Sequence, residues 1–328
     1  MYRPSLKSIW SLAVLAVIAV VLYYIAQNSY SSIQSESYNI KIKAANQMKK
    51  SIEVLREEFD RLGYNIDETN DPNKTGLIGL SASTITTSRG ILEDKITALN
   101  PNFAATYVDL LLSARVNTGD YVAVGTTGAN PGLNLALYSA AQTLGINLVV
   151  IPSVGSAMFG ANRENFTWLD MEKVLYDKEL INFRSVAASI GGGGDIGRGL
   201  SIEGRELIEE KIKSLDIVFI NTGNLDGNIK KRMQLYDEAL PERSRYSAFI
   251  NVGGGLANVG ATVNANLLRD GIYRRLAERN FATEGVMMIF GRRNIPVIHT
   301  FRPRALAERY GLPVEPIPLP NVAEGEVF

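Results

Sequence analysis

The sequence predicts an α/β protein with a mostly parallel, Rossmann-like sheet covered by helices on both faces and preceded by one N-terminal transmembrane helix. Three observations predict this class. One apolar run occupies residues 9–26. Short runs rich in β-branched residues alternate with amphipathic segments along residues 76–328, as expected for βαβ units. Glycine-rich or hydroxyl-rich junctions follow several of these runs, where a buried parallel strand would turn into a helix.

The apolar run would form a helix of roughly 27 Å, close to the hydrocarbon thickness of a bilayer. Arg3 and Lys7 precede it, and no charged residue follows until Glu36. The positive-inside tendency therefore places the N-terminus in the cytoplasm and the C-terminal mass outside, in the periplasm or at the cell surface. The alternatives are a cleaved signal peptide and a buried helix of a soluble protein, although the apolar core of a signal peptide is usually shorter and ends in an A-x-A-like site.

Three segments are expected along the chain. Residues 1–28 form a cytoplasmic stub and the anchor, residues 29–75 a polar tether and an amphipathic helix, and residues 76–328 the extracytoplasmic α/β domain. A division of this domain into two sub-domains near residue 183 is the alternative. Within the second segment, apolar residues recur every three or four positions over residues 40–62, and Gly63 is a natural C-cap.

Helices of the domain are predicted from helical spacing of apolar residues and from capping residues such as Thr167 and Ser201. They span residues 86–99, 101–115, 131–144, 168–180, 202–214, 229–239, 262–279 and 304–310. Strands are predicted for residues 77–80, 121–125, 147–151, 185–188, 216–220, 247–252, 286–290 and 296–299. Residues 312–320 form an extended, proline-rich tail.

The amino-acid composition limits the kinds of catalytic and metal-binding site that the protein can contain. The 328 residues carry zero formal net charge, include no cysteine and include one histidine, His299. Disulfides, thiolate metal sites, cysteine nucleophiles and multi-histidine metal sites are thereby excluded, and we expect no metal, no cofactor and no nucleic-acid partner. Between Arg243 and Arg309 the chain has 11 arginines and no lysine. Arginine pairs carboxylates and phosphates bidentately, so this segment is either an anion-recognition surface or a solvated face of local ion pairs.

Ligands of parallel α/β sheets bind outside the carboxyl ends of the strands, and glycines or hydroxyl residues follow four of the predicted strands. Their amides and hydroxyls can face an anion, or the segments can be tight structural turns. The ligand-binding candidates are Gly125, Thr126, Thr127, Gly128, Asn130, Ser153, Ser156, Gly192, Gly193, Gly194, Asp195, Arg198, Asn251, Gly253 and Gly254.

His299 ends a predicted strand near Arg302, and both residues are further ligand-binding candidates. The catalytic candidates are Thr126 or Thr127 as nucleophile, with His299 assisting. The glycines around the two threonines do not match the G-x-S-x-G pattern, and a single histidine at a strand end is commonly structural. Structural roles for all three residues therefore remain open.

Several strings follow one another along the domain: Asn100-Pro-Asn-Phe-Ala, Gly125-Thr-Thr-Gly, Pro131-Gly-Leu-Asn, Ser153-Val-Gly-Ser, Asn165-Phe-Thr-Trp-Leu-Asp-Met-Glu, Ser185-Val-Ala-Ala-Ser-Ile-Gly-Gly, Asn251-Val-Gly-Gly-Gly and Pro296-Val-Ile-His. As a set they resemble the poly-gamma-glutamate system protein family, which accompanies the bacterial membrane machinery that makes and exports poly-γ-glutamate. The resemblance spans most of residues 76–328. It implies a location at the bacterial cytoplasmic membrane and no particular catalytic residue.

The function expected from residues and resemblance together is that of a membrane-anchored accessory protein. Its partners would be the membrane, poly-γ-glutamate or another polycarboxylate, and membrane-bound synthase or export subunits, the last contacted through the anchor and residues 40–62. The alternative is a hydrolase or transferase acting on γ-glutamyl amide bonds, so whether the protein is an enzyme stays open.

Overall fold

The computed structural model describes residues 8–29, 36–276, 281 and 283–328. The chain divides into two units, Met1–Glu36 and Ser37–Phe328. The first contains α1 (Ile9–Asn28), in which Ile9–Gln27 is long and apolar enough to cross a membrane, as an anchor or a signal sequence would be. Arg3 and Lys7, on which the expected orientation depends, lie outside the described residues.

The second unit begins with α2 (Tyr38–Arg61), which buries one face, including Met48, Leu55 and Phe59, against α4 (Phe103–Ser113) and α5 (Pro131–Leu144). Full burial of side chains of this size stabilises a fold by about 1.5–3 kcal/mol each. The structure therefore places α2 inside the α/β unit, and not in a separate segment with the tether. Gly63 follows the helix with φ +76°, the left-handed conformation expected after a helix end.

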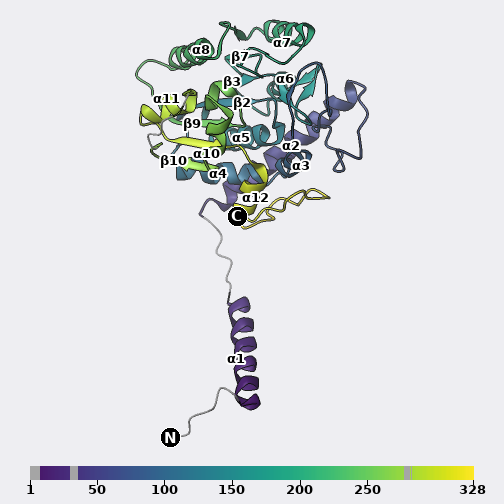
Figure 1. Cartoon of the computed structure of the whole chain (residues 1–328), viewed down its shortest axis with the longest axis vertical. Coiled ribbons are helices and arrows are strands. Elements are labelled where there is room, and N and C mark those ends of the chain that lie inside the picture. Colours follow the sequence, from purple (N-terminus) through teal and green to yellow (C-terminus); the bar gives the residue numbers. More distant parts are fainter. Residues whose placement is uncertain (1–7, 30–35, 277–280, 282) are drawn as a thin grey trace. The chain divides into compact units, whose positions relative to one another are not determined.

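The other helices are placed by local capping signals. Asn130 caps α5, and Thr167 and Asp170 form a capping box at α6. The bounds are α3 (Leu92–Ala98), α6 (Trp168–Asp177), α7 (Ile202–Ser214), α8 (Leu225–Glu238), α9 (Leu256–Val259), α10 (Thr262–Leu267), α11 (Val286–Arg292) and α12 (Pro303–Arg309), as labelled in part in Figure 1.

The main sheet has seven strands among the described residues, and all are parallel except the antiparallel β10 at one edge. In spatial order they are β10 (Gly271–Tyr273), β11 (Val297–Thr300), β9 (Tyr246–Val252), β2 (Tyr121–Thr127), β3 (Asn147–Ser153), β7 (Ala187–Ser189) and β8 (Val218–Ile220). The predicted α/β class with a mostly parallel sheet is confirmed. Two smaller pairs are β1 (Thr86–Ser88) with β4 (Ser156–Ala157) and β5 (Asn162–Arg163) with β6 (Phe166–Thr167).

The chain runs outward from β2 through β3, β7 and β8, and then returns to pair β9 with the opposite side of β2. The point where the direction of progress reverses therefore lies between β2 and β9. Successive residues of β2 enter different hydrophobic clusters: Val122 and Val124 pack with residues of α2, α4 and α5, whereas Ala123 packs with residues of α8 and α11.

Four predicted elements are wrong in whole or in part. Residues 77–80 form no strand, because Gly79 and Leu80 donate their amides to Phe159 O and Asn162 Oδ1 instead of joining a ladder. Residues 86–99 divide into β1 and α3. Between them a Cβ on Gly90 would lie 2.2 Å from a backbone oxygen, so this residue marks a close backbone approach that a continuous helix would not make.

Residues 262–279 are helical only as far as Leu267, because Gly271, with φ +133°, enters β10. Two charged residues of this predicted helix, Glu278 and Arg279, lie outside the described residues. Residues 286–290, predicted as a strand, belong to α11. A short apolar run fits a buried helix as well as a buried strand, and here Phe290 stacks on Phe249 of β9.

The two ends of the second unit meet. Lys41, on the first turn of α2, donates to Val327 O at 2.7 Å and lies 3.3 Å from the Asp109 carboxylate. The rings of Tyr38 and Phe328 pack edge to face with 6.2 Å between centroids.

Candidate functional site

The register of the parallel strands aligns many of the predicted site residues at one edge of the sheet. Thr127 at the end of β2 is level with Ser153 at the end of β3, and Ser153 with Ser189 of β7. Two residues earlier in β2, Gly125 is level with Asn251 of β9. Loops from these strand ends therefore converge where the strand order reverses, the position at which open α/β sheets bind ligands.

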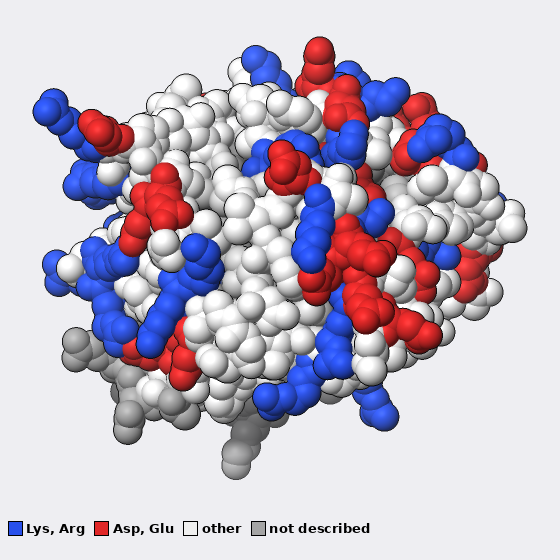
Figure 2. Space-filling view, turned by 90° about the horizontal axis from the view of Figure 1, so that it is seen from above, with Lys and Arg blue, Asp and Glu red and all other residues white. Residues whose placement is uncertain are grey.

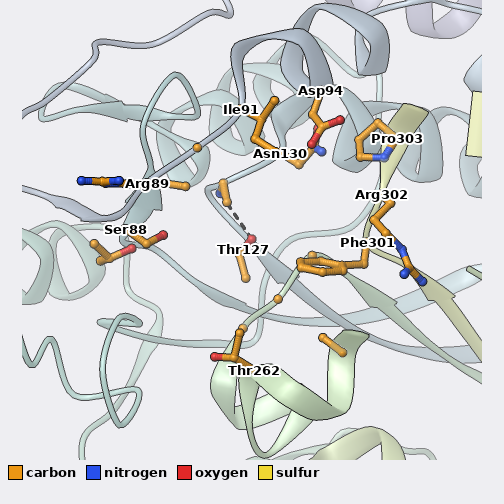
Figure 3. A pocket seen from close by; sticks show the side chains of 18 of the residues that line it. Ser88, Arg89, Ile91, Asp94, Thr127, Asn130, Thr262, Phe301, Arg302 and Pro303 are labelled. Carbon is orange, nitrogen blue, oxygen red and sulfur yellow. Dashed lines mark hydrogen bonds between the residues drawn. The ribbon is translucent and has the colours of Figure 1, made fainter. Parts of the chain in front are cut away.

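A pocket of about 840 Å³ lies at this edge, a volume within the range typical of small-molecule sites. In Figure 3, Thr127 lies between Ser88 and Arg89 on one side and Phe301 and Arg302 on the other. The walls come from residues 87–91, α3, the loops after β2, β3 and β9, the glycine segment after β7, α10, and the start of α12.

The pocket includes about half of the predicted ligand-binding residues. Those that line it are Thr127, Asn130, Ser153, Gly192, Gly193, Gly253, Gly254 and Arg302. Those that do not are Gly125, Thr126, Gly128, Ser156, Gly194, Asp195, Arg198, Asn251 and His299. The loop after β2 and the glycine segment after β7 thus meet in one cavity, whereas the histidine does not reach it.

His299 lies on β11 with no exposed surface. Its Nδ1 accepts from Asn251 Nδ2 at 2.9 Å, and its Nε2 faces Ala265 O at 3.3 Å, which assigns a neutral ring protonated on Nε2. Burial lowers its pKa. Thr126 is also fully buried. Of the three catalytic candidates only Thr127 lines the pocket, and its Oγ1 accepts from Ala129 N at 3.3 Å.

Asp195, in the glycine segment, is buried in a polar network behind the pocket. Its Oδ1 accepts from Ser153 Oγ at 2.7 Å and from Ser189 Oγ at 2.8 Å. Arg232 of α8 lies 3.4 Å from Oδ2, and Asn228 Nδ2 donates to the Asp195 carbonyl at 2.9 Å. Asp195 therefore fixes the glycine segment to β3, β7 and α8. Sequence reasoning did not single out Arg232, because a lone arginine in an amphipathic helix is indistinguishable from a surface residue.

Asn258, beside the pocket-lining Gly255, has buried polar atoms without a partner in the part of the chain that the structure describes. Among the described residues, both amide atoms of Asn258 and the hydroxyl of Thr126 lack a hydrogen bond. A Cβ on Gly125 would lie 2.4 Å from the Asn258 amide, so only glycine admits this side chain against the strand. A Cβ on the pocket-lining Gly255 would lie 3.6 Å from Asn258 Nδ2. Unsatisfied buried polar groups are rare in folded proteins and commonly mark positions with a function.

The charge of the pocket comes mostly from residues that the sequence analysis missed. Four cations and two carboxylates line it: Arg89, Lys95, Arg302, Arg304, Asp94 and Glu308. Arg302 Nε donates to Asp270 Oδ2 and Arg304 Nε to Asp94 Oδ1, both at 2.7 Å. The excess of cations favours an anionic ligand. Thr86, Thr87 and Gly90 were the only signals that residues 86–99 are not one helix, and none of them points to the burial of Lys95.

The arginine-rich segment forms several local ion pairs outside the pocket. Arg292 pairs with Glu284, and Arg293 donates to both oxygens of Asp237 at 2.7 and 3.1 Å. Figure 2 shows one face of the molecule on which basic and acidic side chains lie near one another around a broad uncharged area. Of the two interpretations of this segment, the structure therefore supports local pairing for these arginines and a pocket contact for Arg302 and Arg304.

Among the described residues, no group of three or more histidine, aspartate or glutamate side chains is arranged to hold a metal ion. No family model matches this chain, and no curated protein or solved structure shows significant similarity to it.

Proposed function

We propose that this protein binds a carboxylate-bearing polymer of the poly-γ-glutamate class in the pocket at the carboxyl ends of β2, β3 and β9. The observation that carries the proposal is the charge of the pocket, where four cations face two carboxylates. Arg304 is paired with Asp94 and Arg302 with Asp270, so Arg89 and Lys95 are the two pocket cations without an ion pair among the described residues. The family resemblance of the sequence supplies the candidate polymer, which carries one carboxylate per residue.

The proposal includes a Rossmann-like fold with helices on both faces of the sheet. The reversal of strand order between β2 and β9 supports it, as does the division of neighbouring β2 residues between two hydrophobic clusters. In such folds the reversal point is where ligands bind, and the pocket lies there.

The proposal also includes an uncleaved α1 that anchors the protein in the bacterial cytoplasmic membrane, with residues 37–328 outside. Contact with membrane-bound synthase or export subunits would then be made through α1. The apolar face of α2 is not free for it, because that face packs on α4, α5 and α6. Deleting residues 1–62 would remove α2 from the hydrophobic core. Loss of association in such a variant would therefore not show that these residues contact the synthase or export subunits.

Binding is favoured over cleavage of γ-glutamyl bonds. The predicted pair of nucleophile and assisting base is not assembled in the pocket, because His299 and Thr126 are buried and only Thr127 reaches it. A hydroxyl without a neighbouring base is a weak nucleophile.

The binding test uses the full chain in detergent micelles and fluorescently labelled poly-γ-glutamate. We expect binding that weakens with added salt and that falls about tenfold in Arg89→Met, about 1.4 kcal/mol. Arg89 lines the pocket, is exposed and has no ion-pair partner among the described residues. The matched control is Arg293→Met, which removes an arginine paired outside the pocket. Equal loss in both variants, or no binding at low salt, contradicts the proposal.

The orientation has its own test, which the absence of cysteine makes specific. Ser244 is exposed, so Ser244→Cys provides a single reactive thiol. In intact cells a membrane-impermeant maleimide should label this variant as fully as it does after lysis. Labelling only after lysis would place the domain in the cytoplasm.

A further inference from the structure

Lys95 is a buried basic residue in the pocket wall. The residue is 8% exposed and lines the pocket. Within the described part of the chain it makes no hydrogen bond and no ion pair. Burial lowers the pKa of its amine to about 8, and the nearby Asp94 carboxylate offsets only part of this effect. Moving a charged group out of water without a compensating partner costs free energy. The charged form of Lys95 therefore destabilises the folded protein when no ligand is bound.

The neighbours of Lys95 do not neutralise it. The acidic and basic side chains on the elements around it are Glu93, Asp94, Arg304, Glu308, Arg309, Glu315, Arg89 and Arg302. Arg309 is exposed, and Arg302 is bound to Asp270. Glu93, Glu308, Glu315 and Arg89 are exposed to solvent, and Asp94 is bound by Arg304. One turn after Lys95, the Ala98 carbonyl would lie 2.5 Å from a Cβ on Gly132, so α3 is pressed against the first turn of α5. The helix α3, which carries Lys95, thus packs on α12 and on the capped start of α5, and Lys95 lines the pocket.

We propose that Lys95 receives one anionic group of the ligand, a carboxylate or a phosphate, and that the ligand and a proton bind together. This inference rests on the proposed function in that both use the same pocket. An anion within about 4–6 Å favours the ammonium form. Above about pH 8, where Lys95 has lost its proton in the empty pocket, the lysine therefore regains the proton when the anion arrives. Reciprocally, affinity falls as pH rises above about 8.

The test measures proton uptake directly. The full chain in detergent micelles is titrated in a calorimeter at pH 9 with glutarate and, separately, with inorganic phosphate. Each titration is carried out in two buffers of different ionisation enthalpy, and the difference in the heat of binding gives the number of protons taken up. We expect net proton uptake and an affinity that falls several-fold from pH 7.5 to pH 9.5. Lys95→Met should bind at least tenfold more weakly without proton uptake. Lys95→Arg should bind without proton uptake, because arginine stays protonated. Lys173→Met, which removes an exposed lysine paired with Asp177, should behave as the unaltered protein.

The outcomes separate this inference from the proposed function. If the polymer binds equally to the unaltered protein and to Lys95→Met, or if binding takes up no proton, the inference is wrong while the proposed function stands. If phosphate binds with proton uptake through Lys95 while glutarate and the polymer do not bind, the inference stands and the polymer proposal is wrong. Unchanged far-UV circular dichroism of Lys95→Met establishes that weaker binding is not caused by unfolding.

Discussion

Two buried cations, Arg232 behind the glycine segment and Lys95 in the pocket wall, are held in opposite ways. Arg232 has no exposed surface, and its guanidinium donates to Ile151 O at 2.8 Å and to Ser189 Oγ at 2.6 Å, with Asp195 3.4 Å away. Lys95 is almost as deeply buried, and its side chain has no such partners among the residues that the structure describes. The protein compensates the desolvation of one cation within its own fold and leaves the other uncompensated, which distinguishes a structural charge from one positioned for a ligand.

Ser153 joins the two regions. Its hydroxyl accepts from Arg232 Nη2 at 3.0 Å and donates to Asp195 Oδ1 at 2.7 Å, and the same residue lines the pocket. The structural network therefore forms part of the pocket wall. Four substitutions test the comparison between the two cations, and they are ordered from the largest expected effect on stability to the smallest.

Arg232→Met should destabilise the protein by about 3–5 kcal/mol, because it leaves the buried Asp195 carboxylate without its cation. Urea unfolding of the full chain in detergent, followed by circular dichroism, measures the loss. The double variant Arg232→Met with Asp195→Leu should recover part of it, since neither charge then remains unpaired. A single variant as stable as the unaltered protein would show that the network is not a structural element.

Lys95→Met should have the opposite sign and raise stability at pH 7 by at most about 3 kcal/mol, since a pKa lowered from 10.5 to about 8 corresponds to roughly 1.4 kcal/mol per unit. The unfolded chain holds this proton up to pH 10.5, whereas the folded chain releases it near pH 8. The unaltered protein should therefore gain stability between pH 8 and pH 10.5, and the variant should lack that gain. Identical stability profiles over this range would contradict the uncompensated burial of Lys95.

Glu172 provides an intermediate case: within the described part of the chain, its buried carboxylate accepts three hydrogen bonds and has no paired cation. It accepts from Tyr138 OH at 2.6 Å and from Ser185 N and Oγ, both at 2.8 Å, yet burial raises its pKa. The folded state therefore holds the proton above pH 4.5, and stability falls as pH rises from there. Glutamine does not titrate, so in Glu172→Gln this pH dependence of stability disappears. The free energy of unfolding at pH 7 should differ from that of the unaltered protein by about 1 kcal/mol. Unfolding titrations from pH 4 to pH 8 on both proteins measure it, and equal slopes would refute it.

Arg293→Met should have the smallest effect, less than about 1 kcal/mol, because the pair with Asp237 is exposed to solvent and screened by salt. Urea unfolding at low and at high salt checks this, and the difference from the unaltered protein should vanish at high salt. A loss comparable with that of Arg232→Met would mean that burial does not set the ranking of these charges.

Helices with capping or terminating residues at their ends were predicted correctly from the sequence. The bounds of α5 agree with the prediction at both ends, because Asn130, Pro131 and Gly145 mark them. The strand ends also aligned as expected, since parallel strands in one sheet bring Thr127 and Ser153 together.

The remaining features depend on contacts between segments that are distant in the sequence, so local sequence patterns could not predict them. The strand predicted at residues 286–290 became a helix because packing on β9, and not the apolar pattern itself, decides between the two. Lys95 is indistinguishable in sequence from a surface lysine, whereas in the fold its helix α3 packs on α12 and on the start of α5, which are remote in the chain. His299 has the imidazole of a catalytic base and lies at the predicted edge of the sheet, but Ala265 of α10 covers its ring.

The meeting of Tyr38 with Phe328, and of Lys41 with Val327, makes residues 37–328 a module whose entry and exit points coincide. Chain ends that lie this close can be joined by a short linker, and new ends can be opened in an exposed loop elsewhere. The same geometry allows the module to be inserted whole into a surface loop of a water-soluble carrier, where its ligand could be studied without lipid or detergent.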